Sequence, residues 1–200
     1  PSKTSGPPLI RVAVLKDAPA ASITGGKSRK IFSSSGQPLF SLPDETPLQL
    51  TLLNGLIAIN GKSTEQAALS LRSSSSDELL RLNDQETATQ LNLLSGAGGV
   101  TVIAVLDLET YLFGVLAGEV PFNRWHPEAL KTQAVTSRSY AWNMLQRNAA
   151  QPYDVESTVM SQVFKAGNQH NTILSAAVNS TRGLMLSSDG RHFPAYFHST

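Results

Sequence analysis

The hydrophobic pattern of this chain changes its period near Leu106. Before that residue the apolar positions alternate, as in 48–53, or form short runs such as 56–59. The dipeptides Asn54-Gly55 and Asn60-Gly61 flank the second of these runs. Asn-Gly is the strongest short hairpin signal, because both residues tolerate a positive φ. The first half of the chain is therefore predicted to form a β-meander.

Beyond this point the apolar residues recur at helical spacing. Asp107 is a suitable N-cap for a helix that runs to about Leu116. Pro127 fits the first turn of a second helix, which is expected to extend to about Arg147. A third helix is predicted for 171–182, where a glycine follows and can end it.

The last segment has the pattern of a hairpin. Two partly apolar stretches, 184–186 and 192–198, lie on either side of Asp189-Gly190. Strands therefore come first along the chain, and helices with a final hairpin follow. This order favours an α+β fold over a doubly wound parallel sheet. We expect a β-rich N-terminal half followed by a helical region with a terminal β-hairpin.

Composition excludes several classes of partner and site. The 200 residues include 16 basic and 15 acidic side chains, a net charge of +1. No basic field is available to capture nucleic acid or anionic lipid, so we expect no nucleic-acid partner. Cysteine is absent, which excludes disulfides and thiolate metal sites in this stretch. No apolar run approaches the length of a membrane span.

The histidines do not have the spacing of metal ligands, such as two on one helical turn with a glutamate. They are His126, His170, His192 and His198. We therefore expect no metal and no other cofactor. The opening stretch 1–8, which is rich in proline and serine, is typical of a tail or linker and fits a secreted, processed protein.

Glu119 is the residue with the clearest chemical interest. It follows an apolar helical segment and Gly118, and Val120, Pro121 and Phe122 come directly after it. Apolar surroundings favour the neutral form of a carboxyl group, which a general acid near neutral pH requires. A glutamate that ends a helix and points into water is the simpler alternative. The local pattern leaves both interpretations open.

Two basic residues follow on the second predicted helix. Lys131 and Arg138 are seven residues apart, or two turns, and so lie on nearly the same stripe of that helix. Both could face the cleft that Glu119 enters, where they would bind substrate carboxylates and stabilise developing negative charge. The alternative is a solvated basic face.

Several motifs follow one another in the second half of the chain. They are Tyr111-Leu-x-Gly-Val-Leu-x-Gly-Glu119-Val-Pro121, Trp125-His-Pro-Glu-Ala-Leu-Lys131-x-Gln133-Ala-Val-x-x-Arg138-Ser-Tyr140-Ala, Tyr153-Asp-Val, Ser161-Gln162-Val-Phe, Ala177-Val-x-x-Thr181-Arg182-Gly183 and Ala195-Tyr-Phe-His-Ser-Thr200. Together, and in this order, these motifs resemble the SpoIID/LytB family, the sporulation stage II protein D and amidase-enhancer group of bacterial cell-wall proteins. The resemblance covers about half the chain, from Leu106 to Thr200.

The resemblance implies a peptidoglycan lytic transglycosylase that acts outside the cytoplasm, in the periplasm, in the cell wall or as a secreted protein, often on strands stripped of their peptides. It places the catalytic glutamate of the family on Glu119, and the supporting lysine and arginine on Lys131 and Arg138. Four further residues match cleft motifs and are expected to bind substrate. They are Gln162, Tyr196, His198 and Ser199.

Two departures from the family pattern stand out. Some sporulation members resemble zinc proteins with a histidine and two cysteines, whereas Val155 and Ser161 occupy the cysteine positions here. Zinc is therefore not expected. The family motif usually continues from His-Ser-Thr into a glycine pair, whereas the present chain ends at Thr200. We expect a tail at 1–8, a β-rich region at 9–99 that binds glycan or a partner, and a catalytic region at 100–200 that is truncated at its C-terminus.

The expected reaction uses one carboxyl group. Glu119 would protonate the glycosidic oxygen between N-acetylmuramic acid and N-acetylglucosamine. It would then take the proton of the muramic acid C6 hydroxyl, which closes a 1,6-anhydro ring. One alternative is a hydrolase with a second acid, for which the candidates are Glu109, Glu128 and Asp154. Another is a non-catalytic cell-wall-binding module that stimulates an N-acetylmuramoyl-L-alanine amidase.

Overall fold

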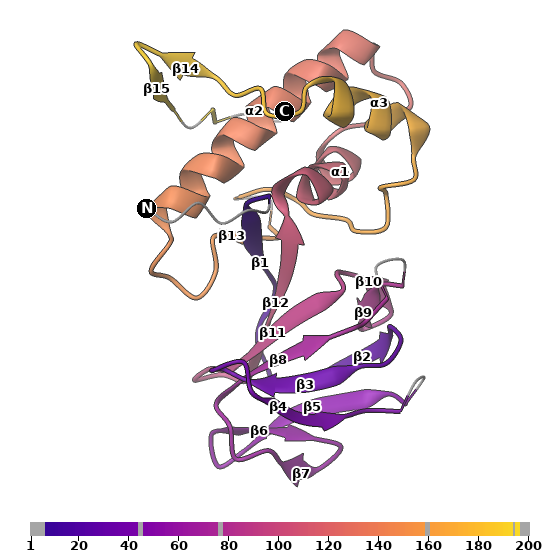
Figure 1. Ribbon diagram of the computed structural model, residues 1–200, viewed down its shortest axis with the longest axis vertical. Coiled ribbons are helices and arrows are strands. Elements are labelled where there is room, and N and C mark those ends of the chain that lie inside the picture. The colour runs from indigo at the N-terminus through magenta and orange to yellow at the C-terminus, as the bar shows by residue number, and fades with distance from the viewer. Residues whose placement is uncertain (1–6, 44–45, 76–77, 159–160, 194, 197–200) are drawn as a thin grey trace. The chain divides into compact units, whose positions relative to one another are not determined.

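The computed structural model describes residues 7–43, 46–75, 78–158, 161–193 and 195–196 (Figure 1). The chain divides into two compact units. One contains the chain up to Val12 together with the part from Leu106 onward, and the other extends from Ala13 to Val105. The chain passes from one unit to the other within two strands, β1 (Leu9–Ala18) and β12 (Val100–Asp107).

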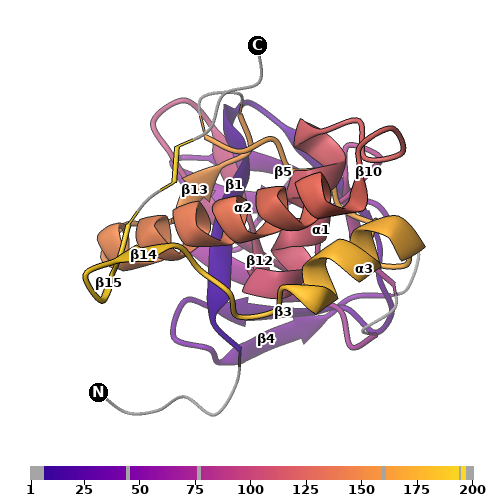
Figure 2. The same cartoon turned by 90° about the horizontal axis from the view of Figure 1, so that it is seen from above.

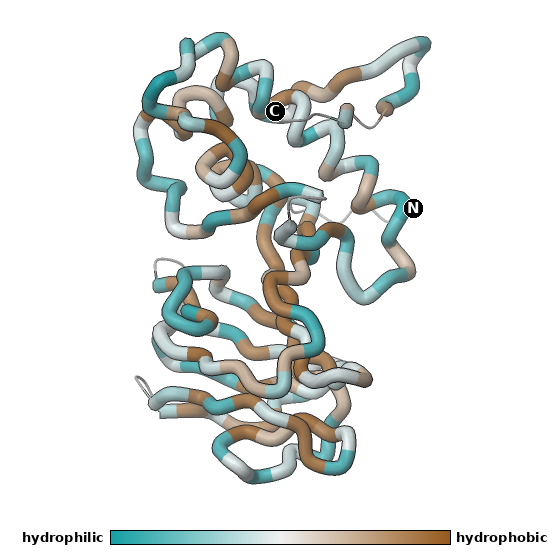
Figure 3. Tube along the Cα trace, turned by 180° about the vertical axis from the view of Figure 1, so that it is seen from behind, coloured by the Kyte–Doolittle hydropathy of each residue, from teal (hydrophilic) through white to brown (hydrophobic). Residues whose placement is uncertain are grey.

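The unit from Ala13 to Val105 is built of antiparallel strand pairs. Its strands, apart from β1 and β12, are β2 (Ala21–Gly25), β3 (Lys30–Ser33), β4 (Pro38–Ser41), β5 (Leu48–Leu53), β6 (Leu56–Ile59), β7 (Lys62–Ser63), β8 (Ala68–Arg72), β9 (Leu80–Leu82), β10 (Gln85–Glu86) and β11 (Gln90–Ser95). One sheet has the order β13-β1-β12-β11-β8-β3-β4, in which β13 is Val155–Glu156, and a second has the order β10-β9-β2-β5-β6-β7. Brown, hydrophobic segments recur along these strands in Figure 3.

The hairpin predictions in this unit are confirmed. β5 and β6 pair with Leu53 opposite Leu56, and β6 and β7 pair with Ile59 opposite Lys62. Both Asn-Gly turns between them have positive φ at each residue, as two-residue hairpin loops require.

The prediction of a simple β-meander is wrong. β8 pairs with β3, and β2 lies between β9 and β5, so strands far apart in the sequence are neighbours. Turn residues specify the pairing of consecutive strands alone. Distant pairs are selected by burial, here through alternating apolar residues such as Leu69 and Leu71 of β8, which are fully or almost fully enclosed.

The other unit contains the helices, and the expected α+β class is confirmed. They are α1 (Leu108–Glu119), α2 (Pro127–Arg147) and α3 (Thr172–Ser180), with a short strand β13 (Val155–Glu156) between α2 and α3. Asp107 caps α1 as expected, since its Oδ1 accepts a hydrogen bond of 2.9 Å from the Thr110 amide. α2 has the predicted bounds, whereas α1 extends three residues further than predicted.

A terminal hairpin is present around Asp189-Gly190, but its first strand lies at 187–188 and not at the predicted 184–186, and part of the predicted second strand, 192–198, lies outside the described residues. The hairpin consists of β14 (Ser187–Ser188) and β15 (Arg191–His192), and Asp189 and Gly190 form the turn with positive φ. α3 is shorter than the predicted 171–182, because Asn171 is its N-cap and the helix ends at Ser180.

α1 is buried on every side through most of its length, which is the pattern of a central helix. α2 and α3 both pack against it, and the view from above in Figure 2 shows the three helices gathered together. This position explains why α1 carries apolar residues all round rather than along one stripe. None of the helices in the described part of the chain combines the length and hydropathy of a membrane span.

Candidate active site

Glu119 is the last residue of α1, and its side chain is half-buried. Oε1 accepts a hydrogen bond of 2.6 Å from the backbone amide of Val163. Among the described residues, no group donates a hydrogen bond to Oε2. The carboxyl group is therefore held through one oxygen, and the other is available for chemistry.

The segment 162–165, which forms neither helix nor strand, lies directly against α1 because two residues of that helix lack a side chain. A Cβ at Gly114 would collide with the Phe164 ring, and a Cβ at Gly118 would collide with the Val163 carbonyl. The amide of Lys165 also donates to the Gly114 carbonyl oxygen at 3.0 Å. The glycines, four residues apart on one face, thus let the backbone of the segment approach the helix closely enough to reach Glu119.

Tyr111 joins the same segment to α1 through its hydroxyl and its ring. The hydroxyl donates to Oε1 of Gln162 at 2.8 Å, and the ring stacks on Phe164 with the centroids 5.5 Å apart. Burial raises the pKa of Tyr111 well above its usual value, and the nearby Tyr140 and Glu119 raise it further. The Tyr111 hydroxyl therefore stays protonated and acts as a donor.

Gln162, expected to bind substrate, is fully buried. Its Oε1 is taken by Tyr111, and its Nε2 has no hydrogen-bond partner among the described residues. A buried amide N–H without a hydrogen-bond partner lowers the stability of the fold. Packing alone would be served better by an apolar side chain at position 162.

Two more tyrosines lie near this group. The Tyr140 hydroxyl is 3.4 Å from Oγ of Ser161, the residue before Gln162. The Tyr140 ring meets the Tyr196 ring edge to face, with the centroids 5.9 Å apart. Tyr196, expected to bind substrate, is 71% exposed. The other two expected substrate-binding residues, His198 and Ser199, lie outside the described residues.

Lys131 lies in the first turns of α2, with 36% of its side chain exposed. Its Nζ donates to Oε1 of Glu128 at 2.7 Å, and this hydrogen bond lowers the pKa of Glu128. Lys131 also lines an apolar groove of about 310 Å³ between the starts of α2 and α3. Among the described residues, no hydrogen bond or ion pair joins Lys131 to Glu119.

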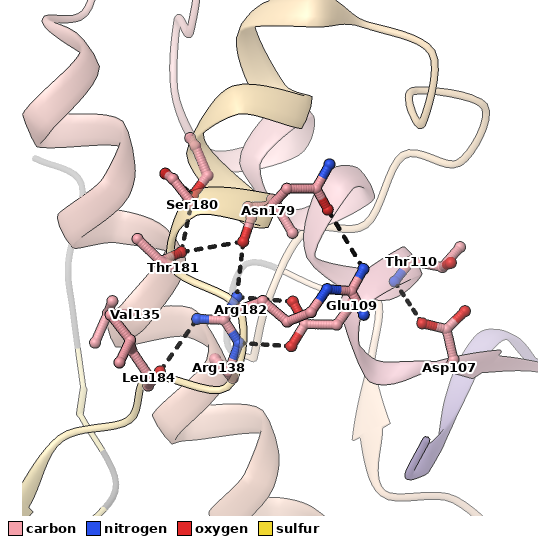
Figure 4. A network of polar contacts seen from close by, with 12 residues as sticks. Asp107, Glu109, Thr110, Val135, Arg138, Asn179, Ser180, Thr181, Arg182 and Leu184 are labelled. Atoms are coloured by element: carbon pink, nitrogen blue, oxygen red, sulfur yellow. Dashed lines mark hydrogen bonds and ion pairs between the residues drawn. The ribbon is translucent and has the colours of Figure 1, made fainter. Parts of the chain in front are cut away.

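Arg138 is buried in an ion pair at the other end of α1 (Figure 4). Its Nε and Nη2 donate to the two carboxylate oxygens of Glu109 at 2.9 and 2.8 Å, and only 1% of Arg138 is exposed. Nη1 donates to the carbonyl oxygen of Leu184 at 3.1 Å. Within the described part of the chain the guanidinium makes no contact of this kind with Glu119.

Asp154 is also buried in an ion pair. Its Oδ1 lies 2.6 Å from Nη2 of Arg11, and its Oδ2 accepts from the Arg11 amide at 2.7 Å. Of the three acids considered as partners for Glu119 in a hydrolase, Glu109 and Asp154 are thus bound to arginines, whereas Glu128 is exposed on α2.

Tyr111, Tyr140 and the Val163 amide have no site role among the predictions made from the sequence. The sequence did contain one indication of this packing. Gly114 and Gly118 are four residues apart in an apolar helix, and such a pair permits another chain segment to pack closely on that face. Nothing local indicated which segment it would be. No group of three or more acidic or histidine side chains that could hold a metal occurs among the residues described.

Comparison with known proteins gives the family of this region. The model of the SpoIID family, Stage II sporulation protein, matches residues 96–187, which include α1, α2 and α3. Residues 96–187 form a SpoIID family domain. The SpoIID family is a bacterial cell-wall family that includes peptidoglycan-degrading proteins.

Curated relatives match about half of the chain. An uncharacterized protein of Brachyspira hyodysenteriae is 36% identical over 97 residues, which are 48% of this chain and 26% of that protein. Stage II sporulation protein D of Bacillus subtilis is 34% identical over 110 residues, and that of Bacillus amyloliquefaciens is 32% identical over 110 residues. Each of these two alignments covers 48% of this chain and 32% of the relative. The SpoIID domain described here thus spans about a quarter to a third of its curated relatives.

Proposed function

We propose that this SpoIID domain is a peptidoglycan lytic transglycosylase. It would cleave the bond between N-acetylmuramic acid and N-acetylglucosamine in glycan strands, with peptide-free strands as substrates, outside the cytoplasm. The observation that carries this proposal is the state of the Glu119 carboxyl group, with Oε1 fixed by the Val163 amide and Oε2 without a donor among the described residues.

Glu119 would serve first as acid and then as base. Its proton passes to the glycosidic oxygen as the bond to the anomeric carbon breaks, and N-acetylglucosamine leaves as an alcohol. The resulting carboxylate takes the proton of the muramic acid C6 hydroxyl as that oxygen bonds to the anomeric carbon. The 1,6-anhydro ring forms, Glu119 is protonated again, and no water is consumed.

The surroundings of the other acids support a mechanism with one carboxyl group. A hydrolase needs a second carboxylate near the scissile bond. Glu109 and Asp154 are each engaged by an arginine inside the unit, and withdrawing either would leave a buried charge without its partner.

The roles of the basic residues are part of the proposal. Lys131, which is partly exposed, would contact the lactyl carboxylate of muramic acid or other substrate oxygens. Arg138 would support the site from within the fold, because its pair with Glu109 fixes the first turn of α1. Tyr196, His198 and Ser199 remain predicted substrate contacts.

The test is replacement of Glu119 by glutamine, which keeps the shape of the side chain and its acceptor oxygen. Cleavage of purified glycan strands should fall by at least about 10²- to 10⁴-fold, while sedimentation with the same strands is unchanged. Glu86→Gln, an exposed carboxyl group on β10, is the matched control and should keep full activity. A wild-type protein that cleaves nothing but increases the turnover of a cell-wall amidase would instead support the binding module.

A further inference from the structure

Gln162 matches a cleft motif, but its environment is that of an interior residue. The side chain is fully buried, and its oxygen is bound to the Tyr111 hydroxyl at 2.8 Å. A side chain in this position does not meet solvent directly. Its influence on a reaction at Glu119 would therefore pass through the residues that it contacts.

Those contacts lead to Glu119 in two steps. Val163, the next residue, donates its amide to Oε1 of Glu119 at 2.6 Å. Tyr111 lies near the start of α1 and Glu119 at its end, so both ends of this helix are bonded to the segment that contains Gln162 and Val163. The Tyr111 ring, stacked on Phe164, holds the segment from the other side of Val163.

We infer that Tyr111 and Gln162 are positioning residues that hold the Val163 amide against Oε1 of Glu119 and so keep Oε2 directed at the reacting oxygens. This inference rests on the proposed function, because the oxygen being oriented is that of the proposed acid. The chemistry explains the polar pair. Methionine at position 162 would fill a similar volume and leave no buried N–H without a partner, but its sulfur is only a weak acceptor for the Tyr111 hydroxyl.

The kinetic test compares Tyr111→Phe and Gln162→Met with the wild-type protein. Tyr111→Phe removes one oxygen and keeps the ring that stacks on Phe164. Each variant should lower kcat by about 10- to 100-fold, since a shift of about 1 Å in a catalytic group is enough for such a loss. KM should stay within about threefold, because neither side chain touches the substrate. The double variant should be no slower than the slower single variant, since both remove the same hydrogen bond.

Tyr153→Phe is the matched control. Tyr153 lies in the same unit, and its hydroxyl donates to Oε1 of Glu156 at 3.0 Å. Removing that hydroxyl should leave kcat and KM unchanged. If Gln162→Met does not fold, Tyr111→Phe alone carries the test. A normal kcat for Tyr111→Phe, or a raised KM with a normal kcat for Gln162→Met, would overturn the inference.

A second readout is independent of activity. The amide proton of Val163 should resonate far downfield and exchange slowly in the wild-type protein, and both properties should be lost in Tyr111→Phe and in Glu119→Ala. A Val163 amide that is unchanged in Tyr111→Phe would contradict the positioning role. Absence of glycan cleavage by the wild-type protein would count against the proposed function, while this measurement would still decide the role of Tyr111.

Discussion

The backbone amide of Val163 donates a hydrogen bond of 2.6 Å to Oε1 of Glu119, which lies 44 residues earlier in the chain. Glu119 ends α1, where a glutamate could extend into water. The Val163 contact instead fixes its carboxyl group against a second segment of the chain, so the orientation of the proposed acid depends on how closely that segment packs on α1.

The glycines of α1 should therefore be sensitive to the smallest substitution. Gly118→Ala puts a Cβ against the Val163 carbonyl oxygen, which belongs to the backbone and cannot rotate away. Alanine favours a helix by about 1 kcal/mol over glycine, yet we expect a net loss of about 1–3 kcal/mol in the free energy of unfolding, because overpacking dominates. Urea denaturation measures this change.

Gly114→Ala provides the internal control for that explanation. Its Cβ would meet the Phe164 ring most closely, and the Lys165 carbonyl oxygen lies next, at 3.0 Å, so a smaller side chain at position 164 can relieve the larger part of the conflict. Phe164→Leu should offset part of the loss caused by Gly114→Ala. If the two losses simply add, steric conflict with Phe164 is not the cause.

The buried pair of Arg138 and Glu109 should behave differently when one partner or both are replaced. Arg138→Met leaves the Glu109 carboxylate without its bidentate partner, and the free energy of unfolding should fall by about 3–5 kcal/mol. Replacing both residues by methionine should recover much of that loss. Lys131→Met, at a partly exposed pair, should change stability little. Equal losses in the single and double variants would contradict this description of the pair.

Tyr111 gives the protein a dependence on alkaline pH. Because burial raises its pKa in the folded state above the usual value of about 10, the unfolded chain loses this proton first as the pH rises. The stabilisation is complete below about pH 10 and is lost as the pH rises from there toward the folded pKa. The free energy of unfolding of Tyr111→Phe should therefore decrease less steeply above about pH 10 than that of the wild-type protein. If the free energies of unfolding of the two proteins fell in parallel above about pH 10, the pKa of Tyr111 would not be raised in the folded state.

Local signals predicted the helices and tight turns well. α2 begins at Pro127 and ends at Arg147 as expected, because a proline start and a long apolar period are contained within the element itself. β2 (Ala21–Gly25) and β3 (Lys30–Ser33) gave no distinct signal. They contain few apolar residues, and pairing with distant strands stabilises them.

The site shows the same difference between local and distant interactions. Helical spacing places Lys131 and Arg138 on one stripe of α2, but it does not predict which other elements bury each turn of that helix. Arg138 is enclosed by Glu109 and by backbone carbonyls that include Leu184, whereas the first turns that carry Lys131 are open. The hydrogen bond from Val163 to Glu119 is donated by a main-chain amide, so the pattern of side chains in the sequence does not predict it.

The most direct test of the central proposal is mass analysis of the products formed from purified, peptide-free glycan strands in water labelled with heavy oxygen. If Glu119 is the sole acid and base of a transglycosylation, every new muramic acid end will be a 1,6-anhydro sugar, one water lighter than a reducing end and free of label. Reducing ends that carry the label would contradict the proposal and show that water, activated by a second group, is the nucleophile.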